Sequence, residues 1–210
     1  MLVTLVKKYP LLRQMYLRGR SQSLLLIYKI SLSLSFASLT GLAAQVRFPL
    51  PWTPVPITGQ TFVVLLSSLV LGKWLGGLSQ LLYIGIGICG IPWFTGGNTG
   101  FSYLAGPTGG YLIGFIFAAF FLGYIKNISK SPGFILLIFY MLLANFLLIH
   151  GIGLIQLYLW LNVFGANPLG IKELTSMGTL PFIPSDILKI IAVATMAKTV
   201  TLCQEKFSNK

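Results

Sequence analysis

The chain has 210 residues, of which 55% are hydrophobic and 9% are charged, and its formal net charge is +12. An ordinary soluble domain carries about 25% charged residues, so this chain lacks the polar surface that a soluble enzyme or a disordered protein needs. The composition therefore indicates an integral membrane protein. Six crossings of about 20 residues each would fill most of its length.

The first 23 residues precede the first apolar run and carry five of the cations: Lys7, Lys8, Arg13, Arg18 and Arg20. We interpret residues 1–23 as a basic cytoplasmic extension that lies on anionic lipid headgroups. Nucleic-acid binding is disfavoured because no cluster of Lys and Arg is interleaved with aromatic residues on a soluble face. The remaining residues, 24–210, form the predicted membrane-embedded domain.

Six apolar runs follow in chain order, and we expect spans at 24–46, 59–72, 74–90, 108–125, 133–161 and 183–203. The second and third runs are short and are separated only by Gly72 and Lys73, so we expect a tight hairpin there. The sequence thus predicts an all-α membrane protein with six transmembrane helices.

The distribution of cations predicts the orientation of these spans. If the N-terminus is cytoplasmic, the inner segments hold ten Lys and Arg residues. The outer loops, 47–58, 91–107 and 162–182, hold only Arg47 and Lys172. We therefore expect a multi-pass protein of the cell (plasma or inner) membrane with both termini cytoplasmic and a substrate pocket under the extracellular loops.

Two of the outer loops have unusual compositions. Residues 47–58 contain four prolines, which predict a stiff connection that is not helical. Residues 91–107 contain no charge, four glycines and four aromatic residues, Trp93, Phe94, Phe101 and Tyr103. Because glycine lets the backbone come close to a ligand, this loop is either a lid over a pocket or an aromatic belt at the membrane interface.

Few ionisable residues lie in or near the spans. Asp186 and Lys189 are three residues apart and share a helix face. Such groups are normally paired or functional in a membrane, so they form either a self-neutralising pair or the polar floor of a pocket. His150, the sole histidine, is either a proton relay or a packing residue. The sequence has no P-loop and no Cys/His metal motif, so ATP-driven work would need another chain, and no cofactor is expected.

Four motifs occur in order between residues 37 and 195. They are Pro54-Val-Pro-Ile-Thr-Gly-Gln-Thr61, Gly90-Ile-Pro-Trp-Phe-Thr-Gly-Gly97, Gly106-Pro-Thr-Gly-Gly-Tyr-Leu112 and Phe182-x-x-x-Asp-x-x-Lys189. Together they resemble the BioY family, the biotin-binding S components of energy-coupling factor (ECF) transporters. The basic extension has no counterpart in this resemblance.

The resemblance implies a membrane protein that binds biotin from outside and delivers it across the membrane. It would act as the substrate-specific subunit of an ATP-driven vitamin importer, with a transmembrane coupling subunit and two ATPase subunits as partners. The residues leave open an S component for thiamine or riboflavin, and a non-transport membrane protein such as an embedded enzyme or assembly factor. An enzyme is disfavoured because the sequence offers no evident nucleophile–base pair.

The resemblance also implies functional residues. It assigns polar contacts with biotin to Asp186, Lys189 and Asn98, and a contact with the coupling subunit to Ala37 and Gly41, whose spacing would bare a helix face for close approach. Asp186 would accept from a ureido N–H while Lys189 donates to the ureido carbonyl, or Lys189 would meet the carboxylate. Trp93, Phe94 and Tyr83 would form the wall around the apolar ring of biotin. Asn98 and the N–H groups of the loop, with Gly96 and Gly97, would take the carboxylate.

Overall fold

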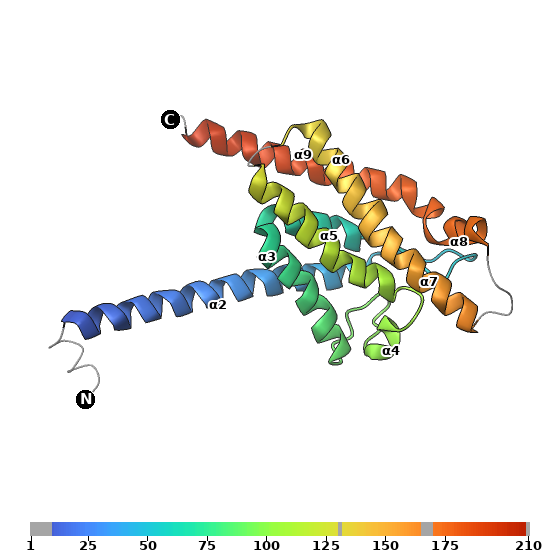
Figure 1. The fold of residues 1–210 in the computed structure, drawn as a ribbon, viewed down its shortest axis with the longest axis horizontal. Helices are drawn as coiled ribbons and strands as arrows, with labels where there is room; N and C mark the ends of the chain where they lie inside the picture. The colour runs from blue at the N-terminus through green and yellow to red at the C-terminus, as the bar shows by residue number, and fades with distance from the viewer. Residues whose placement is uncertain (1–9, 130–131, 165–169, 209–210) are drawn as a thin grey trace.

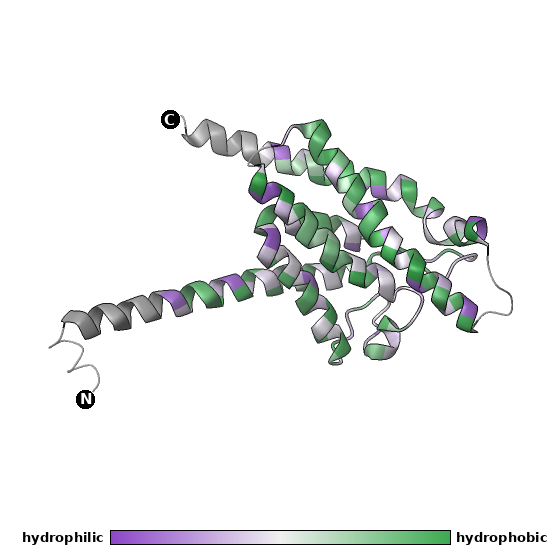
Figure 2. Cartoon of the chain, viewed as in Figure 1, coloured by the Kyte–Doolittle hydropathy of each residue, from purple (hydrophilic) through white to green (hydrophobic). Residues whose placement is uncertain are grey.

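The computed structural model describes residues 10–129, 132–164 and 170–208, and this part of the chain is mostly helical (Figure 1). Hydrophobic residues dominate the helices of the bundle (Figure 2). Five helical stretches are long and apolar enough to cross a membrane: Gln22–Gln45, Gln60–Ile88, Gly109–Ile128, Phe134–Val163 and Ile171–Thr199. The prediction of a helical, multi-pass membrane protein is therefore confirmed.

The first span is the C-terminal part of a longer helix. Helix α2 runs from Pro10 to Gln45, so it begins well before the predicted start at residue 24. Its N-terminal part projects beyond the bundle in Figure 1, and the side chains of residues 22–30 are exposed. Contact with the bundle begins near Ser33, whose hydroxyl donates to the carbonyl of Leu75 at 3.1 Å. The helix therefore continues without a break across the predicted boundary at residue 23.

Helix α3, Gln60–Ile88, is interrupted at Gly72, where φ is +76° and ψ is −174°. Glycine adopts a positive φ at little cost because it has no Cβ. The chain turns back there, since the Nε2 of Gln60 donates to the hydroxyl of Tyr83 at 2.9 Å. The predicted reversal at Gly72 is thus confirmed.

Lysine from a neighbouring helix caps the interrupted end of α3. A helix end leaves its last carbonyls without helical partners. The ammonium group of Lys126 donates to the carbonyls of Leu69 and Val70, in the turn before Gly72. This contact holds the turn-back of α3 against the following helix, α5.

The proline-rich segment contains no helix, as predicted. Its ends form β1, Arg47–Phe48, and β2, Ile57–Thr58, which pair antiparallel with Arg47 opposite Thr58. The remaining elements are α4 (Phe101–Leu104), α5 (Gly109–Ile128), α6 (Phe134–Leu142), the π-helix η1 (Leu143–His150), α7 (Gly151–Phe164), α8 (Ile171–Gly178), the 3₁₀ turn η2 (Leu180–Phe182) and α9 (Ile183–Ser208).

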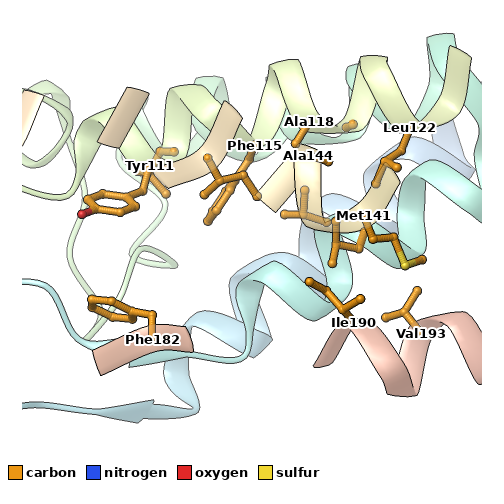
Figure 3. Packing of buried hydrophobic residues seen from close by; sticks show 14 of the residues in the cluster. Tyr111, Phe115, Ala118, Leu122, Met141, Ala144, Phe182, Ile190 and Val193 are labelled. Atoms are coloured by element: carbon orange, nitrogen blue, oxygen red, sulfur yellow. The ribbon is translucent and has the colours of Figure 1, made fainter. Parts of the chain in front are cut away.

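The core lies between α5, the continuous run of α6, η1 and α7, and α9. Two glycines on α5, Gly110 and Gly114, let the backbones approach closely. A Cβ at Gly114 would lie 2.7 Å from the Cα of Ile149. Figure 3 shows the side chains that fill the space between these helices: Phe115, Ala118, Leu122, Met141, Ala144, Ile190 and Val193. Helices α4 and α8 lie on the side of the bundle away from both termini (Figure 1).

Candidate binding site

A cavity of about 50 Å³ lies beneath the loops, where α3, α5, η1 and α9 meet. One part of its lining is apolar and includes Leu112, Phe115, Ile149 and Phe182. The rest is polar and contains the acid and the lysine that the sequence singled out. The polar residues that line it are Thr58, Gln60, Thr61, Thr95, Tyr103, Thr108, Tyr111, His150, Asp186 and Lys189.

The carboxylate of Asp186 is the centre of the polar part and is almost fully buried. Its Oδ1 accepts from the Nζ of Lys189 at 2.8 Å and from the hydroxyl of Thr61 at 3.4 Å. Its Oδ2 accepts from the Nδ2 of Asn145 at 2.9 Å and lies 2.9 Å from the Nε2 of His150. We call these five residues the floor cluster. Because a carboxylate has about four lone-pair sites, protein groups already occupy all the acceptor positions of Asp186.

The π-helical turn explains why two residues five apart reach the same carboxylate oxygen. In an α-helix of 3.6 residues per turn, Asn145 and His150 would point about 140° apart. In η1 the backbone bonds run from i to i+5, which brings such residues nearly into line. Sequence reasoning missed Asn145 for this reason. It left His150 between two roles, and the structure places both ring nitrogens in polar contacts.

Lys189 is a floor residue that lines the cavity and has donor capacity to spare. An ammonium group has three N–H donors. Its contacts with Asp186, at 2.8 Å, and with the hydroxyl of Thr61, at 3.0 Å, use two of them. Since Lys189 also lines the cavity, its third donor is available to a ligand there.

Residues 47–58 and 91–100, which we call the roof, contribute Val55, Pro56, Thr58 and Thr95 to the lining of the cavity. Gln60 joins both segments, because its Oε1 accepts from the hydroxyls of Thr58 at 2.9 Å and Thr95 at 3.2 Å. The roof is also tied to α2, where the Nε2 of Gln45 donates to the carbonyls of Trp93 at 3.2 Å and Phe94 at 3.1 Å. The roof is therefore hydrogen-bonded to helices on two sides.

The profile of the BioY family matches residues 17–205. The chain belongs to the BioY family. A relative from Methanothermobacter thermautotrophicus named "Probable biotin transporter BioY" is 46% identical over 138 residues, which are 65% of this chain and 87% of the relative. The "Biotin transporter BioY" of Thermotoga maritima is 34% identical over 77% of this chain and 89% of its own length.

A solved structure is also similar to this BioY chain. It is described as the S-component for biotin from an ECF-type ABC transporter. The match has a TM-score of 0.72 at 25% identity and covers 83% of this chain and 91% of the other. The fold and the sequence therefore point to the same family.

Three of the aromatic residues expected in the BioY site form a block beside the cavity. Phe94 is fully buried, with its ring stacked on Tyr103 at 5.1 Å and edge-on to Tyr83 at 5.5 Å between centroids. The indole N–H of Trp93 donates to the carbonyl of Tyr83 at 2.9 Å. Of these rings, only that of Tyr103 lines the cavity. Sequence reasoning did not single out Tyr103 for the site, although the residue was noted among the loop aromatics.

The residues of the glycine-rich loop that were expected to contact biotin lie on the outside of the roof. Gly96 and Gly97 have φ of +80° and +74° and make a tight turn. Asn98 is exposed, and its Nδ2 donates to the carbonyl of Thr95 at 2.7 Å. Thr95, rather than Asn98, lines the cavity in this conformation. A role for Asn98, Gly96 and Gly97 in binding stays a prediction.

In this structure Ala37 and Gly41 do not lie on an exposed helix face, and their contact with a coupling subunit stays a prediction. Ala37 is fully buried, and a Cβ at Gly41 would lie 3.0 Å from the Cβ of Trp93. Both residues face the inside of the chain because α2 packs this small-residue stripe against α3 and the roof. A contact between these two residues and a coupling subunit would require the loop that carries Trp93 to move away.

Proposed function

We propose that this BioY chain binds biotin in the cavity and delivers it across the membrane as the substrate-specific subunit of an ATP-driven ECF importer. The observation that carries the proposal is the buried, ionisable floor cluster inside a membrane bundle, in a chain whose relatives are named biotin transporters. Ionisable groups at such a position commonly mark a substrate path.

The chemistry of biotin matches the two kinds of lining. Biotin has a ureido ring with two N–H donors and one carbonyl, a thioether ring and a carboxylate tail. The apolar side chains of Leu112, Phe115 and Phe182 suit the thioether ring and the aliphatic tail. The uncharged amide and hydroxyls of Gln60 and Thr95 suit the uncharged ureido group.

The carboxylate of biotin is a better partner for Lys189 than the ureido carbonyl is. Because protein donors occupy the acceptor positions of Asp186, a ureido N–H would have to displace one of them. The free N–H of Lys189 can donate to a carboxylate without breaking a contact, and such charge-assisted bonds are about twice as strong as neutral ones. We therefore favour the arrangement in which Lys189 meets the carboxylate and Asp186 holds Lys189 in place.

The roof has to move for biotin to bind. The cavity of about 50 Å³ is smaller than the roughly 300–1,000 Å³ of typical ligand pockets. The roof is the movable part, since it consists of loops, whereas the floor side chains sit on packed helices. Asn98 and the N–H groups of Gly96 and Gly97 would reach the ligand in the rearranged roof.

We further propose six crossings, with both termini on the cytoplasmic side of the cell membrane. The start of α2 and the end of α9 lie on the side of the bundle opposite α4 and α8 (Figure 1), and this arrangement supports an even number of crossings. Counting the two halves of α3 separately around Gly72 gives six. The excess of Lys and Arg on the terminal side supports the orientation.

The orientation is tested with cysteine labelling. Cys89 is exposed after α3 on the outer side of the proposed arrangement. With Cys203 replaced by Ser, an impermeant maleimide should label Cys89 in intact cells. In a variant without native cysteines, Ser129→Cys should be labelled only after permeabilisation. Labelling of both positions from outside would contradict six crossings.

The choice of vitamin is tested by binding. Purified full-length protein should bind radiolabelled biotin, and unlabelled biotin should displace it whereas thiamine and riboflavin should not. Reconstituted alone in ATP-loaded vesicles, the chain should not concentrate biotin, because the coupling and ATPase subunits supply that work. Displacement by thiamine or riboflavin would reassign the substrate, and ATP-driven accumulation by this chain alone would remove the proposed partners.

A further inference from the structure

Arg47 lies where the two segments of the roof meet. A Cβ at Gly96 would lie 2.9 Å from the Cζ of Arg47 and closer still to its Nη1, so the guanidinium fills the space that a side chain at position 96 would need. Arg47 belongs to the segment 47–58, and Gly96 belongs to the segment 91–100. This contact therefore bridges the line along which the two segments meet, which we call the seam.

The seam also reaches the cavity. Arg47 is directly opposite Thr58 in the ladder of β1 and β2, and the side chains of such a pair lie on one face with their Cβ atoms about 4.5–5.5 Å apart. Thr58 lines the cavity, and so does Thr95, the neighbour of Gly96 in the chain. The Oε1 of Gln60 accepts from the hydroxyls of both threonines. The seam therefore connects Arg47 with the lining of the cavity.

The guanidinium of Arg47 is exposed and has no counter-charge in the described part of the chain. A guanidinium has five N–H donors and stays charged in proteins. Both ion-pair contacts of the described residues belong to Asp186 in the floor. Glu173 is bonded instead to the backbone N–H of Gly170 on α8. The donors of Arg47 are therefore available to an anion that arrives at the seam.

A cation at this position runs against the distribution of charge in the sequence. In the proposed arrangement the outer loops hold only Arg47 and Lys172, whereas the inner segments hold ten Lys and Arg residues. Membrane proteins keep Lys and Arg mainly in cytoplasmic loops, so the orientation of the chain does not account for Arg47. Contact with an anionic ligand that enters from outside does.

We propose that biotin enters through the seam and that Arg47 is a specificity-determining residue there, which contacts the carboxylate during entry before Lys189 receives it. The inference rests on the proposed function, because it takes biotin as the ligand and Lys189 as the final contact of the carboxylate. A group that meets the ligand only during entry lowers the free energy of the transition state and of neither end state. Arg47 must therefore raise the association and dissociation rates by the same factor and leave the affinity unchanged.

The test measures these rates for purified full-length protein in nanodiscs of phosphatidylcholine, which has no net charge. The ligands are tritium-labelled biotin and biotinamide, in which an uncharged carboxamide replaces the carboxylate. In Arg47→Gln, biotin should associate and dissociate about fivefold more slowly at low salt, which corresponds to the loss of one contact between charges in water. The rates of biotinamide should not change. Near 1 M salt, where the screening length is about 3 Å, most of the difference between the wild type and Arg47→Gln should disappear.

Two further variants separate charge from packing. Arg47→Lys keeps the charge, so its biotin rates should stay within about twofold of the wild type. Lys172→Gln removes the other outer cation, at an exposed position on α8, and should leave both rates unchanged. Arg47→Met provides a second neutral replacement if Arg47→Gln does not fold.

Three results would overturn the role of Arg47: unchanged biotin rates in Arg47→Gln, an equal slowing of biotinamide, or an equal slowing of biotin in Lys172→Gln. A loss of affinity without slower association would also overturn it, since Arg47 would then hold biotin in the bound state. A wild-type protein that does not bind biotin would instead refute the proposed function.

Discussion

The floor cluster joins side chains from three separate helical segments, whereas the roof is held largely through backbone atoms. On the floor, Thr61 of α3, Asn145 and His150 of η1, and Lys189 of α9 all meet the carboxylate of Asp186. In the roof, the backbone N–H of Gly100 and the hydroxyl of Thr99 both bond to the carbonyl of Gly87, at 2.9 and 2.7 Å.

This difference indicates that the floor and the roof of the cavity are stabilised in different ways. The floor depends on charge, because without the carboxylate of Asp186 the half-buried ammonium group of Lys189 would lose its counter-charge. The roof depends on volume and backbone conformation, because it consists of tight turns over aromatic rings. Loops of this kind can shift as units while the helices beneath keep their positions. Substitutions should therefore affect the floor through charge and the roof through packing.

The largest expected effect is that of removing the floor carboxylate. Asp186→Ala leaves the half-buried Lys189 without its counter-charge and the buried His150 without its contact at Nε2, and breaking a buried pair costs about 3–5 kcal/mol. We expect a clear fall in the thermal unfolding midpoint of the purified protein and a low yield. Asp186→Asn keeps the shape but removes the same negative charge, so it should be destabilised by a similar amount. A variant Asp186→Asn that is nearly as stable as the wild type would show that the floor is held by shape and hydrogen bonds rather than by charge.

The next largest effect on stability is expected where the roof packs against α3. A Cβ at Gly87 would overlap the ring of Phe94, whereas a Cβ at Gly85 meets nothing within 4 Å. Gly87→Ala should therefore destabilise the protein by about 1–3 kcal/mol, the usual cost of overpacking. Gly85→Ala, two residues away on the same helix, should be neutral or stabilising by up to about 1 kcal/mol. Thermal unfolding followed by tryptophan fluorescence measures both, and a similar loss in both variants would contradict the packing argument.

A smaller effect is expected from loosening the roof without overpacking it. Gln45→Ala removes the donor that holds the carbonyls of Trp93 and Phe94. At about 1 kcal/mol for a hydrogen bond, biotin should dissociate about five times faster, while unfolding changes little. Leu42→Ala, at an exposed position one turn earlier on α2, serves as the control. A dissociation rate that stays at the wild-type value would mean that Gln45 does not hold the roof.

The smallest expected effect is that of Asn98. Its side chain is exposed, so Asn98→Ala should not change the unfolding midpoint. If Asn98 reaches biotin in the rearranged roof, the loss of one neutral hydrogen bond of about 1 kcal/mol weakens biotin binding about fivefold. Equilibrium binding at constant salt measures this, with Ser102→Ala on α4 as the control. Unaltered affinity would confine the ligand contacts to the residues that line the cavity.

Much of this architecture follows from local sequence. Hydrophobic runs predicted the helical spans, four prolines predicted the helix-free segment between Arg47 and Thr58, and a glycine between two short apolar runs predicted the reversal at Gly72. Each of these is a property of neighbouring residues. Spacing also predicted that Asp186 and Lys189 interact, because residues three apart on a helix are neighbours.

Other features depend on contacts between distant segments. The stripe of Ala37 and Gly41 could have faced a partner or the interior, and the position of Trp93 decides for the interior. Trp93, Phe94 and Tyr83 were expected in the cavity wall, but they pack on one another beside it. Which side of a helix or loop is covered depends on elements far away in the sequence, so composition alone could not predict it.

By itself the sequence determined the class of protein, the approximate positions of the membrane spans and the family, because these follow from hydropathy and short motifs. Only the tertiary structure decided which side chains share the carboxylate of Asp186. Asn145 and His150 are about forty residues from it, and their spacing points both of them at one oxygen only because the helix widens into a π turn at η1.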